Sequence, residues 1–387
     1  MKFIFKLIFK ILGALLGVFV LVVGIYVGYV MIQYNRIEDA QALVVNHPSS
    51  SIKKVSLQTE YQITTYNIGF GAYSPDFDFF MDSGVMKDGK KVTGHRGTAI
   101  SKEHVLYDIA GAAKTIQDIN PDFAFFQEVD TRSTRSYEVN QDDYLRTQFD
   151  EYDHVHAINF HSAYLLYPFH DPHGKARSGI TTLSRYTITE ATRYSFTVSK
   201  SLSKFFDLDR CFSVSSVEVE NGHQLLLVNL HMSAYDKGGK IRAKQMEELN
   251  AFLAQAQEKG DYVIAGGDFN HDLLTYNPNY AYTFESLPFA NQTEQQKPEW
   301  LASFFDENGK SGLPEGYQVI ASDNISTCRG ADMPWQEGVN YVTVIDGFIV
   351  SSNVHVVAHQ NIATSDDKVG QYAYSDHQPA WMSFTLE

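Results

Sequence analysis

The chain has 387 residues, of which 44% are hydrophobic and 13% aromatic, so it is long and apolar enough for one large domain with a buried core. Its formal net charge is −15, and residues 37–387 carry 27 basic and 46 acidic residues, a net charge of −19. Because affinity for nucleic acids comes largely from Lys and Arg side chains that displace counterions, this charge argues against tight binding of duplex DNA.

The N-terminal residues predict a helix that spans a membrane. Lys2, Lys6 and Lys10 precede an uncharged run that extends from Ile11 to Gln33. About 20 apolar helical residues cross the core of a bilayer, and this run is long enough. A cleaved signal peptide would have a shorter apolar region of about 7–15 residues that ends in small side chains. This run ends in bulky side chains, so we interpret it as a retained anchor.

The anchor sets the expected orientation and domain organisation. Positively charged flanks stay on the cytoplasmic side, so the rest of the chain is expected on the extracytoplasmic side. We divide the chain into a cytoplasmic basic N-terminus (1–10), a transmembrane helix (11–34), a polar linker (35–58) and a single folded domain (59–387).

Two amphipathic helices are predicted within the folded domain. In the first, apolar residues recur at helical spacing from Val105 to Ile119, and Asn120-Pro121 ends the pattern. In the second, apolar residues recur from Ile241 to Leu253, before Gly260.

Seven strands are predicted from short apolar runs, several of which are apolar at consecutive positions. Consecutive apolar residues are typical of a sheet that is covered on both faces. The stretches 152–173 and 273–316 carry aromatic, Pro and Gly residues without a steady period and are expected to be surface loops. The predicted strands are 61–66, 123–126, 179–183, 225–230, 262–265, 342–350 and 379–384.

Polar side chains that can carry chemistry lie where the predicted strands end. Any one of them alone has an ordinary explanation, because a carboxylate at a strand end is usually solvated or caps a turn. Several such positions in one chain point instead to a shared site. These residues are Asn67, Glu128, His231, Asp268, Asn270, Asp376 and His377.

The residue types in this set are chemically consistent with a metal-assisted hydrolase. Carboxylate oxygens suit Mg²⁺, Mn²⁺ or Ca²⁺. Two histidines with neighbouring carboxylates can transfer protons near neutral pH. The chain has no thiolate cluster for structural zinc, no Gly-rich phosphate loop that ends in Lys-Ser/Thr and no Gly-x-Ser-x-Gly turn.

These residues resemble the endonuclease/exonuclease/phosphatase superfamily, which includes pancreatic-type deoxyribonuclease and neutral sphingomyelinases. The resemblance covers about residues 60–387, and its segments occur in the order of the family. Gly267-Asp268-Phe269-Asn270 together with a terminal Ser375-Asp376-His377 is the most specific combination. The other matching segments are Thr65-Tyr66-Asn67-Ile68, Phe126-Gln127-Glu128-Val129, Ser178-Gly179-Ile180, Leu183-Ser184-Arg185, Val228-Asn229-Leu230-His231 and Ile345-Asp346-Gly347-Phe348.

The resemblance implies a fold and a metal site. The fold would be an α+β, four-layer α/β/β/α sandwich of two packed mixed sheets, which follows the predicted transmembrane helix. Residues 59–387 would then be the catalytic domain. Glu128 would be the principal metal ligand with Asn67 beside it, Asp376 would reach a second metal position, and the cofactor would be Mg²⁺, with Mn²⁺ or Ca²⁺ as substitutes.

The resemblance also implies catalytic roles. His377 would activate the attacking water or contact the phosphate, and Asp346 would orient it. Asp268 and Asn270 would position the nucleophile and hold the phosphoryl group, and His231 would stabilise the phosphate or protonate the leaving oxygen. The reaction would be an in-line attack of water on phosphorus.

The substrate is not determined by the fold, and several alternatives stay open. The acidic domain, the membrane anchor and the aromatic stretches 77–80 and 164–169 favour a lipid head group or another small phosphodiester. The alternatives are an extracellular membrane-tethered nuclease, a phosphomonoesterase for inositol phosphates and a non-catalytic surface binding module. No protein partner is predicted.

Five further residues are not assigned to the site. Arg177, Arg185 and Arg210 could contact a phosphate, and each is interpreted as a surface or structural arginine. Cys328 and Cys211 are the only cysteines, and the sequence does not decide whether they form a disulfide.

Overall fold

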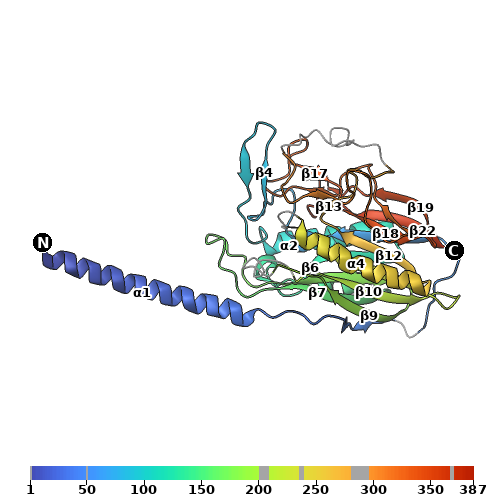
Figure 1. Ribbon diagram of the computed structural model, residues 1–387, viewed down its shortest axis with the longest axis horizontal. Coiled ribbons are helices and arrows are strands. Elements are labelled where there is room, and N and C mark those ends of the chain that lie inside the picture. The colour runs from blue at the N-terminus through green and yellow to red at the C-terminus, as the bar shows by residue number, and fades with distance from the viewer. Residues whose placement is uncertain (1, 49–50, 200–208, 235–238, 280–295, 367–369) are drawn as a thin grey trace.

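A long N-terminal helix projects from a folded domain in the computed structural model, which describes residues 2–48, 51–199, 209–234, 239–279, 296–366 and 370–387 (Figure 1). This helix, α1 (Lys2–Gln33), starts before the predicted span, so residues 2–10 are helical as well. Among the described residues, Phe3–Gln33 is the one stretch with the length and hydropathy of a membrane-crossing helix: it has 31 residues, and an 18-residue window within it reaches a mean hydropathy of 2.7. A retained anchor and an N-terminal signal sequence share this character.

Two seven-stranded mixed sheets form the body of the domain (Figure 1). In each sheet one central pair is parallel, β11 with β12 and β3 with β6, and the other pairs are antiparallel. The first sheet has the order β1 (Gln41–Ala42), β9 (Ile188–Ser195), β10 (Cys211–Glu218), β11 (Gln224–His231), β12 (Tyr262–Asp268), β18 (Asp346–Ser351) and β15 (Tyr317–Ile320). The second has the order β19 (Val354–Asn361), β22 (Ala380–Leu386), β3 (Tyr61–Asn67), β6 (Phe123–Asp130), β8 (Arg177–Ser184), β7 (Asp153–His161) and β2 (Val45–Asn46).

The remaining elements are short or lie outside the sheets. The helices are α2 (Lys102–Ile119), α3 (Gln141–Gln148) and α4 (Lys240–Lys259), with the 3₁₀ turns η1 (Gly69–Gly71) and η2 (Thr134–Ser136). The short strands are β4 (Ser83–Val85), β5 (Lys91–Thr93), β13 (His271–Asp272), β14 (Ala302–Ser303), β16 (Cys328–Arg329), β17 (Val342–Thr343), β20 (Ser365–Asp366) and β21 (Gly370–Gln371).

The predicted four-layer α+β sandwich is confirmed by how the strands distribute their apolar side chains. In β6, Phe123 and Phe125 pack into the core between the two sheets, whereas Ala124 and Phe126 pack with Ile109 of α2. The central strand β12 divides its residues in the same way between the inter-sheet core and α4. A strand that is covered on both faces buries every residue, which explains the consecutive apolar residues of the sequence.

Both predicted helices are confirmed. The hydroxyl of Ser101 accepts a hydrogen bond from the backbone N–H of His104 at the start of α2, and Asn120 ends the helix in the left-handed conformation. Gly260 ends α4 in the same conformation, with φ 73°.

Three expectations differ from the structure. The stretch 152–173 is not a loop throughout, because Asp153–His161 forms β7 and pairs with β8. The predicted strand 342–350 is two strands, since β17 pairs with β16 and β18 pairs with β12 and β15. The expected loop 273–316 contains β14, and its residues 280–295 lie outside the described residues.

The two cysteines are not joined. Cys211 and Cys328 are both buried and free. Burial raises the pKa of the Cys211 thiol to about 11 and that of the Cys328 thiol to about 12, so both are protonated at neutral pH.

Candidate active site

The candidate site residues meet at one edge of the two packed sheets, although they come from six separate segments. Asn67, His231 and Asp268 are the last residues of β3, β11 and β12, and Asp346 is the first residue of the antiparallel β18. Six of the candidate residues line a cavity of about 210 Å³. These are Glu128, His231, Asp268, Asn270, Asp376 and His377, and the polar lining also includes Arg135, Arg210 and Arg329 as well as Asp82, His173 and Asp332.

Asp268 lies at the centre of this cluster. Its Oδ2 atom is 3.2 Å from Nε2 of His231 and 3.8 Å from Nε2 of His377, and it accepts a 3.0 Å hydrogen bond from Nδ2 of Asn67. Burial alone would raise the pKa of Asp268, but the two neighbouring histidines outweigh burial and hold it below its usual value. Asp268 is therefore an anionic group that both imidazoles share.

A second carboxylate, Asp346, lies behind His377 and away from the cavity. It is fully buried, and its Oδ2 atom is 2.8 Å from Nδ1 of His377. Burial raises the pKa of Asp346 to about 6. Burial would lower the pKa of His377, but Asp346 outweighs it and holds that pKa well above its usual value. Asp346 thus fixes the ring and leaves Nε2 on the side of Asp268.

The second imidazole has the opposite electrostatic character. Burial, and then the positive charge of Arg210, lower the pKa of His231 below its usual value. Its Nδ1 atom has no hydrogen-bond partner among the described residues. The site therefore pairs one imidazole that favours the neutral form with one that favours the cation.

Glu128 is presented to the cavity by an irregularity in β6. The register between β6 and β8 shifts between Phe126 and Val129, and Glu128 has a left-handed φ of 56°. Bulges re-aim side chains, and a left-handed conformation is uncommon for a residue other than glycine. The Glu128 side chain is 21% exposed, and Oε1 is 3.4 Å from Nδ2 of Asn67. Its carboxylate is thus partly accessible at the cavity.

The donor set suits a divalent cation. Burial raises the pKa of Asp376 to about 7, and the negative charge of Glu128 adds to this effect. A cation between the two carboxylates would stabilise the ionised form of Asp376. Asn67 lies beside Glu128, with its side-chain oxygen on the backbone N–H of Gly69, 3.0 Å away. Glu128 and Asp376 are therefore the candidate ligands, with Asn67 holding Glu128 in place.

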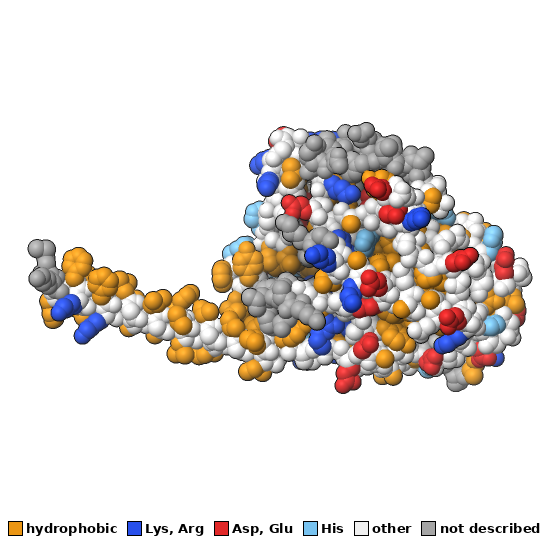
Figure 2. Space-filling view, in the orientation of Figure 1, with side chains coloured by type: hydrophobic (Ala, Val, Ile, Leu, Met, Phe, Trp, Pro, Cys, Tyr) orange, Lys and Arg blue, Asp and Glu red, His pale blue; other side chains and the backbone are white. Residues whose placement is uncertain are grey.

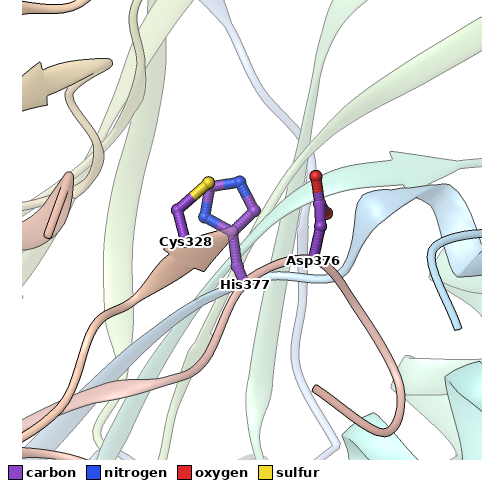
Figure 3. A group of neighbouring side chains, drawn as sticks. All are labelled: Cys328, Asp376 and His377. Atoms are coloured by element: carbon purple, nitrogen blue, oxygen red, sulfur yellow. The ribbon is translucent and has the colours of Figure 1, made fainter. Parts of the chain in front are cut away.

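Cys328 adds a soft donor next to these groups, and sequence reasoning did not assign it to the site. Figure 3 shows its sulfur beside the imidazole of His377, with the carboxylate of Asp376 on the other side of the ring. One donor atom from each of the three lies within 4.8 Å of the others. Because thiol sulfur is a poor ligand for Mg²⁺ and a good one for Zn²⁺, this group differs in preference from the carboxylate pair.

Asn270 acts on the cluster through its backbone. Its N–H donates a 2.9 Å hydrogen bond to Oδ1 of Asp268, and its side-chain Nδ2 donates to the carbonyl of Met232 at 2.9 Å. It has a φ of 50°, and its own carbonyl accepts a hydrogen bond from buried Arg242. This turn fixes the carboxylate of Asp268 at the end of β12.

Two arginines that the sequence did not assign to the site, Arg210 and Arg329, line the cavity. Arg210 was interpreted as a surface or structural residue, but it is buried and lines the cavity. Arg329 was not considered, and it also lines the cavity while donating to the carbonyls of Tyr73 and Ser74. Arg185 bonds to Tyr152 and Asn120, away from the cavity. The only signal for Arg210 was its position directly before β10.

A buried polar bridge joins the two sheets beneath the site. Nε2 of Gln127 donates a 2.8 Å hydrogen bond to Oδ1 of Asn229, and Nδ2 of Asn229 donates to the carbonyl of Thr181 at 3.0 Å. Gln127 directly precedes Glu128, and Asn229 is two residues before His231. The bridge therefore couples the strands that carry two of the site residues.

The sequence of the chain matches a known protein family. A model described as the Endonuclease/Exonuclease/phosphatase family matches residues 64–377. No curated protein sequence matches.

Several solved structures are similar. ANGEL2, described as a 2',3'-cyclic phosphatase, has 15% identity and a TM-score of 0.52 over 88% of this chain and 99% of its own. D. rerio TDP2, complexed with a single-strand DNA product, has 13% identity and a TM-score of 0.51 over 85% and 100%. An endonuclease/exonuclease/phosphatase family protein from Bacteroides thetaiotaomicron has 14% identity and a TM-score of 0.50 over 86% and 97%. At these identities the likeness concerns the fold.

Proposed function

The chain belongs to the endonuclease/exonuclease/phosphatase family and is a metal-dependent phosphoric ester hydrolase, and we propose that it is a phosphodiesterase for a lipid head group or another small phosphodiester. The observation that carries this proposal is the lining of the cavity. The lining combines the charged cluster around Asp268 with apolar side chains, among them Phe79, Met81, Val85 and Met86.

The volume of the cavity and the net charge of the domain support a small substrate. Its volume of about 210 Å³ is below the roughly 300–1,000 Å³ of a pocket for a drug-sized ligand, so it holds a phosphate group and its nearest substituents. The net charge of −19 on residues 37–387 repels long polyanions. Apolar side chains in the lining of a cavity of this size suit a phosphodiester whose remaining part is apolar.

The proposed roles follow from the contacts. Glu128 and Asp376 would hold the divalent cation, Mg²⁺ in the first instance, which supplies Lewis-acid stabilisation of phosphoryl charge when bound. His377, fixed at Nδ1 by Asp346, presents Nε2 to the attacking water and the phosphoryl oxygen. His231 lies on the other side of Asp268 and handles the proton of the leaving oxygen.

Asp268 and Asn270 complete the proposed set. Asp268 keeps both imidazoles at fixed distances, and the Asn270 backbone keeps Asp268 in place. Arg210 and Arg329 add positive charge at the cavity and would neutralise phosphate oxygens. Water attack then converts the diester to a monoester and an alcohol, with the two histidines on opposite sides of Asp268.

We further propose that residues 11–34 anchor the enzyme in a membrane, with residues 1–10 in the cytoplasm and the catalytic domain, 59–387, on the extracytoplasmic side. The hydropathy of α1 and the three lysines near its start support this orientation. The segment 35–58 then leads from the membrane into the catalytic domain and contributes β1 and β2, which are edge strands of the two sheets.

A membrane-tethered nuclease is the second candidate. The specific observation in its favour is the pair of buried arginines, Arg210 and Arg329, at the cavity. They would serve a nucleic-acid phosphate as well as a lipid phosphate. A single strand could offer one phosphate to the cavity, whereas the acidic domain disfavours a duplex.

A substrate panel on the full-length protein in detergent micelles tests both candidates. The panel contains sphingomyelin, phosphatidyl lipids, inositol phosphates, single- and double-stranded DNA and a chromogenic phosphodiester, each with Mg²⁺ and with EDTA. His377→Ala serves as the inactive variant, and His223→Ala, a half-exposed histidine outside the cavity, as its matched control. Turnover of a lipid or small diester that needs Mg²⁺ and His377 supports the proposal, and preference for DNA establishes the nuclease.

A further inference from the structure

The segment between β7 and β8 exposes an unusual concentration of apolar side chains. Outside α1, the described part of the chain exposes eleven large hydrophobic side chains, and four of them fall within residues 164–169. They are Tyr164, Leu166, Tyr167 and Phe169, with exposures of 39%, 42%, 54% and 83%. Single exposed apolar residues need no explanation, but such a cluster marks an interaction surface. We call residues 162–176 the aromatic loop.

The aromatic loop is bonded to the N-terminal helix. The hydroxyl of Tyr26 donates to the carbonyl of Tyr164 at 3.2 Å and accepts from the N–H of Leu166 at 3.1 Å. The hydroxyl of Tyr29 accepts from the N–H of Tyr164 at 3.1 Å. Two tyrosines of α1 therefore hold the backbone of the loop against the helix, more than a hundred residues away in sequence.

These contacts fix the level of the loop relative to α1. At about 1.5 Å per residue, Tyr26 lies about 10 Å before the end of α1 at Gln33. In the proposed anchor 11–34, about 20 residues from Ile11 cross the hydrocarbon core and reach Val30, so Tyr29 lies at the outer boundary of the core and Tyr26 about one helical turn below it. Tyrosines are enriched at this boundary between hydrocarbon and head groups. Residues 164–166 lie at the same level.

We propose that the aromatic loop is a second membrane contact, which inserts Leu166, Tyr167 and Phe169 into the outer leaflet at head-group depth beside α1. This inference rests on the proposed anchoring of α1. A lipid bilayer is the occupant that the contacts favour, because the exposed side chains continue the apolar surface of α1. Figure 2 shows hydrophobic side chains gathered on the end of the domain from which α1 projects.

The backbone of the aromatic loop is suited to this environment. Leu165 and Gly174 exchange two hydrogen bonds of 3.0 Å across the loop, and the N–H of His173 donates to the carbonyl of Tyr167 at 3.2 Å. The N–H groups of Tyr164 and Leu166 donate hydrogen bonds to the tyrosine hydroxyls of α1. Polar backbone groups are expensive in an apolar medium unless they are paired, and these are paired.

The aromatic loop also forms part of the surroundings of the active site. The ring of Tyr167 packs against Phe80 with centroids 5.5 Å apart, and Phe80 packs against His173 at 5.8 Å. Phe79 and His173 line the active-site cavity. Membrane insertion of the loop would therefore hold the cavity at the bilayer surface, where a phosphate ester in a lipid head group is reached without leaving the bilayer.

Depth measurements on the full-length protein test the inference. Phe169→Cys, Val22→Cys in α1 and Val357→Cys on β19 are each labelled with an environment-sensitive fluorophore, and the protein is reconstituted into phosphatidylcholine vesicles. The vesicles contain lipids spin-labelled at the head group or deep in the acyl chain. All three side chains are exposed, so the folded domain tolerates the changes, and the wild-type chain measures labelling of its buried cysteines.

The expected result is that the label at position 169 loses most of its fluorescence to the head-group quencher. The label at position 22 loses it to the acyl-chain quencher, and the label at position 357 keeps it. If the labels at 169 and 357 are equally unquenched while position 22 is quenched, the docking of the loop is wrong and the anchor stands. If the label at position 22 is unquenched, both the membrane anchor and the docking of the loop are wrong. Neither result depends on activity, so the hydrolase proposal is judged separately.

Discussion

Asp268 and Asp346 lie directly opposite each other in the antiparallel register of β12 and β18, and the imidazole nearest to each differs: His231 for Asp268 and His377 for Asp346. Asp268 is bonded to His231 and has a lowered pKa, whereas the pKa of Asp346 is raised to about 6 by burial. Two carboxylates on neighbouring strands therefore serve distinct purposes. One faces the cavity as an anion, and the other holds a ring from behind.

Asp346→Asn is expected to lower kcat by about 10²–10⁴-fold with a much smaller change in KM. The amide cannot accept the Nδ1–H of His377 in the same way, so the tautomer and orientation of the ring are lost. Steady-state kinetics on the best substrate of the panel measure the effect. Asp323→Asn, outside the cavity, serves as the control, and a wild-type kcat for Asp346→Asn would contradict the orienting role.

Glu128→Gln is expected to raise the Mg²⁺ concentration needed for half-maximal activity by at least about tenfold. The change keeps the size of the side chain and removes the charge that the cation needs. Activity is titrated with Mg²⁺ after EDTA treatment, which should abolish turnover in every variant. Glu138→Gln, an exposed glutamate, is the matched control. Equal Mg²⁺ curves for the two variants would remove Glu128 from the metal site.

Zn²⁺ is expected to inhibit the Mg²⁺-supported activity, and Cys328→Ser should raise the inhibitory concentration about tenfold or more. The sulfur of Cys328 completes a set with His377 and Asp376 that suits Zn²⁺. Inhibition curves at fixed Mg²⁺ provide the measurement, with Cys211→Ala as the control for loss of a buried thiol. The idea fails if both cysteine variants keep the Zn²⁺ sensitivity of the wild type.

Asp142→Asn is expected to lower the free energy of unfolding by about 1–3 kcal/mol at pH 7. Asp142 accepts hydrogen bonds from Nε2 of His154 and the hydroxyl of Thr181, both at 2.8 Å. Burial opposes its ionisation, but His156 and His154 outweigh burial and lower its pKa.

Because the pKa is lowered in the folded state, the contribution of Asp142 is present above the unfolded pKa of about 3.9 and is lost as the pH falls below it. Urea denaturation at pH 7 and at lower pH should therefore show the gap between wild type and Asp142→Asn closing with acid. Asp143→Asn, the exposed neighbour, is the comparison. A gap that stays constant with pH would mean that the ionised carboxylate does not contribute.

The sequence predicted the central strands because their burial is complete. Phe123–Phe126 of β6 face two different layers, and both layers are apolar, so no polar residue interrupts the run. In β7, by contrast, Asp153, His154 and His156 interrupt the pattern, and their partners, such as Asp142, lie on other segments. Strand pairing that depends on such distant partners has no local signature.

The site could be predicted in part for the same reason. Asn67, His231 and Asp268 follow buried runs, so their position at a sheet edge is visible in the sequence. Arg329 and Cys328 lie on a two-residue strand, and Arg329 reaches the cavity through contacts with Tyr73 and Ser74, about 255 residues away. Only the three-dimensional structure brings such segments together.

Both sheets contribute residues to the site, and this determines how heat inactivates the enzyme. Asn67 and Glu128 extend from the second sheet, and His231, Asp268 and Asp346 extend from the first. No single sheet carries a working subset, so a partly unfolded state in which the sheets have come apart cannot retain residual turnover. Heat inactivation should then coincide with the first loosening of the inter-sheet core, and the bridge between Gln127 and Asn229 becomes a determinant of thermal lifetime.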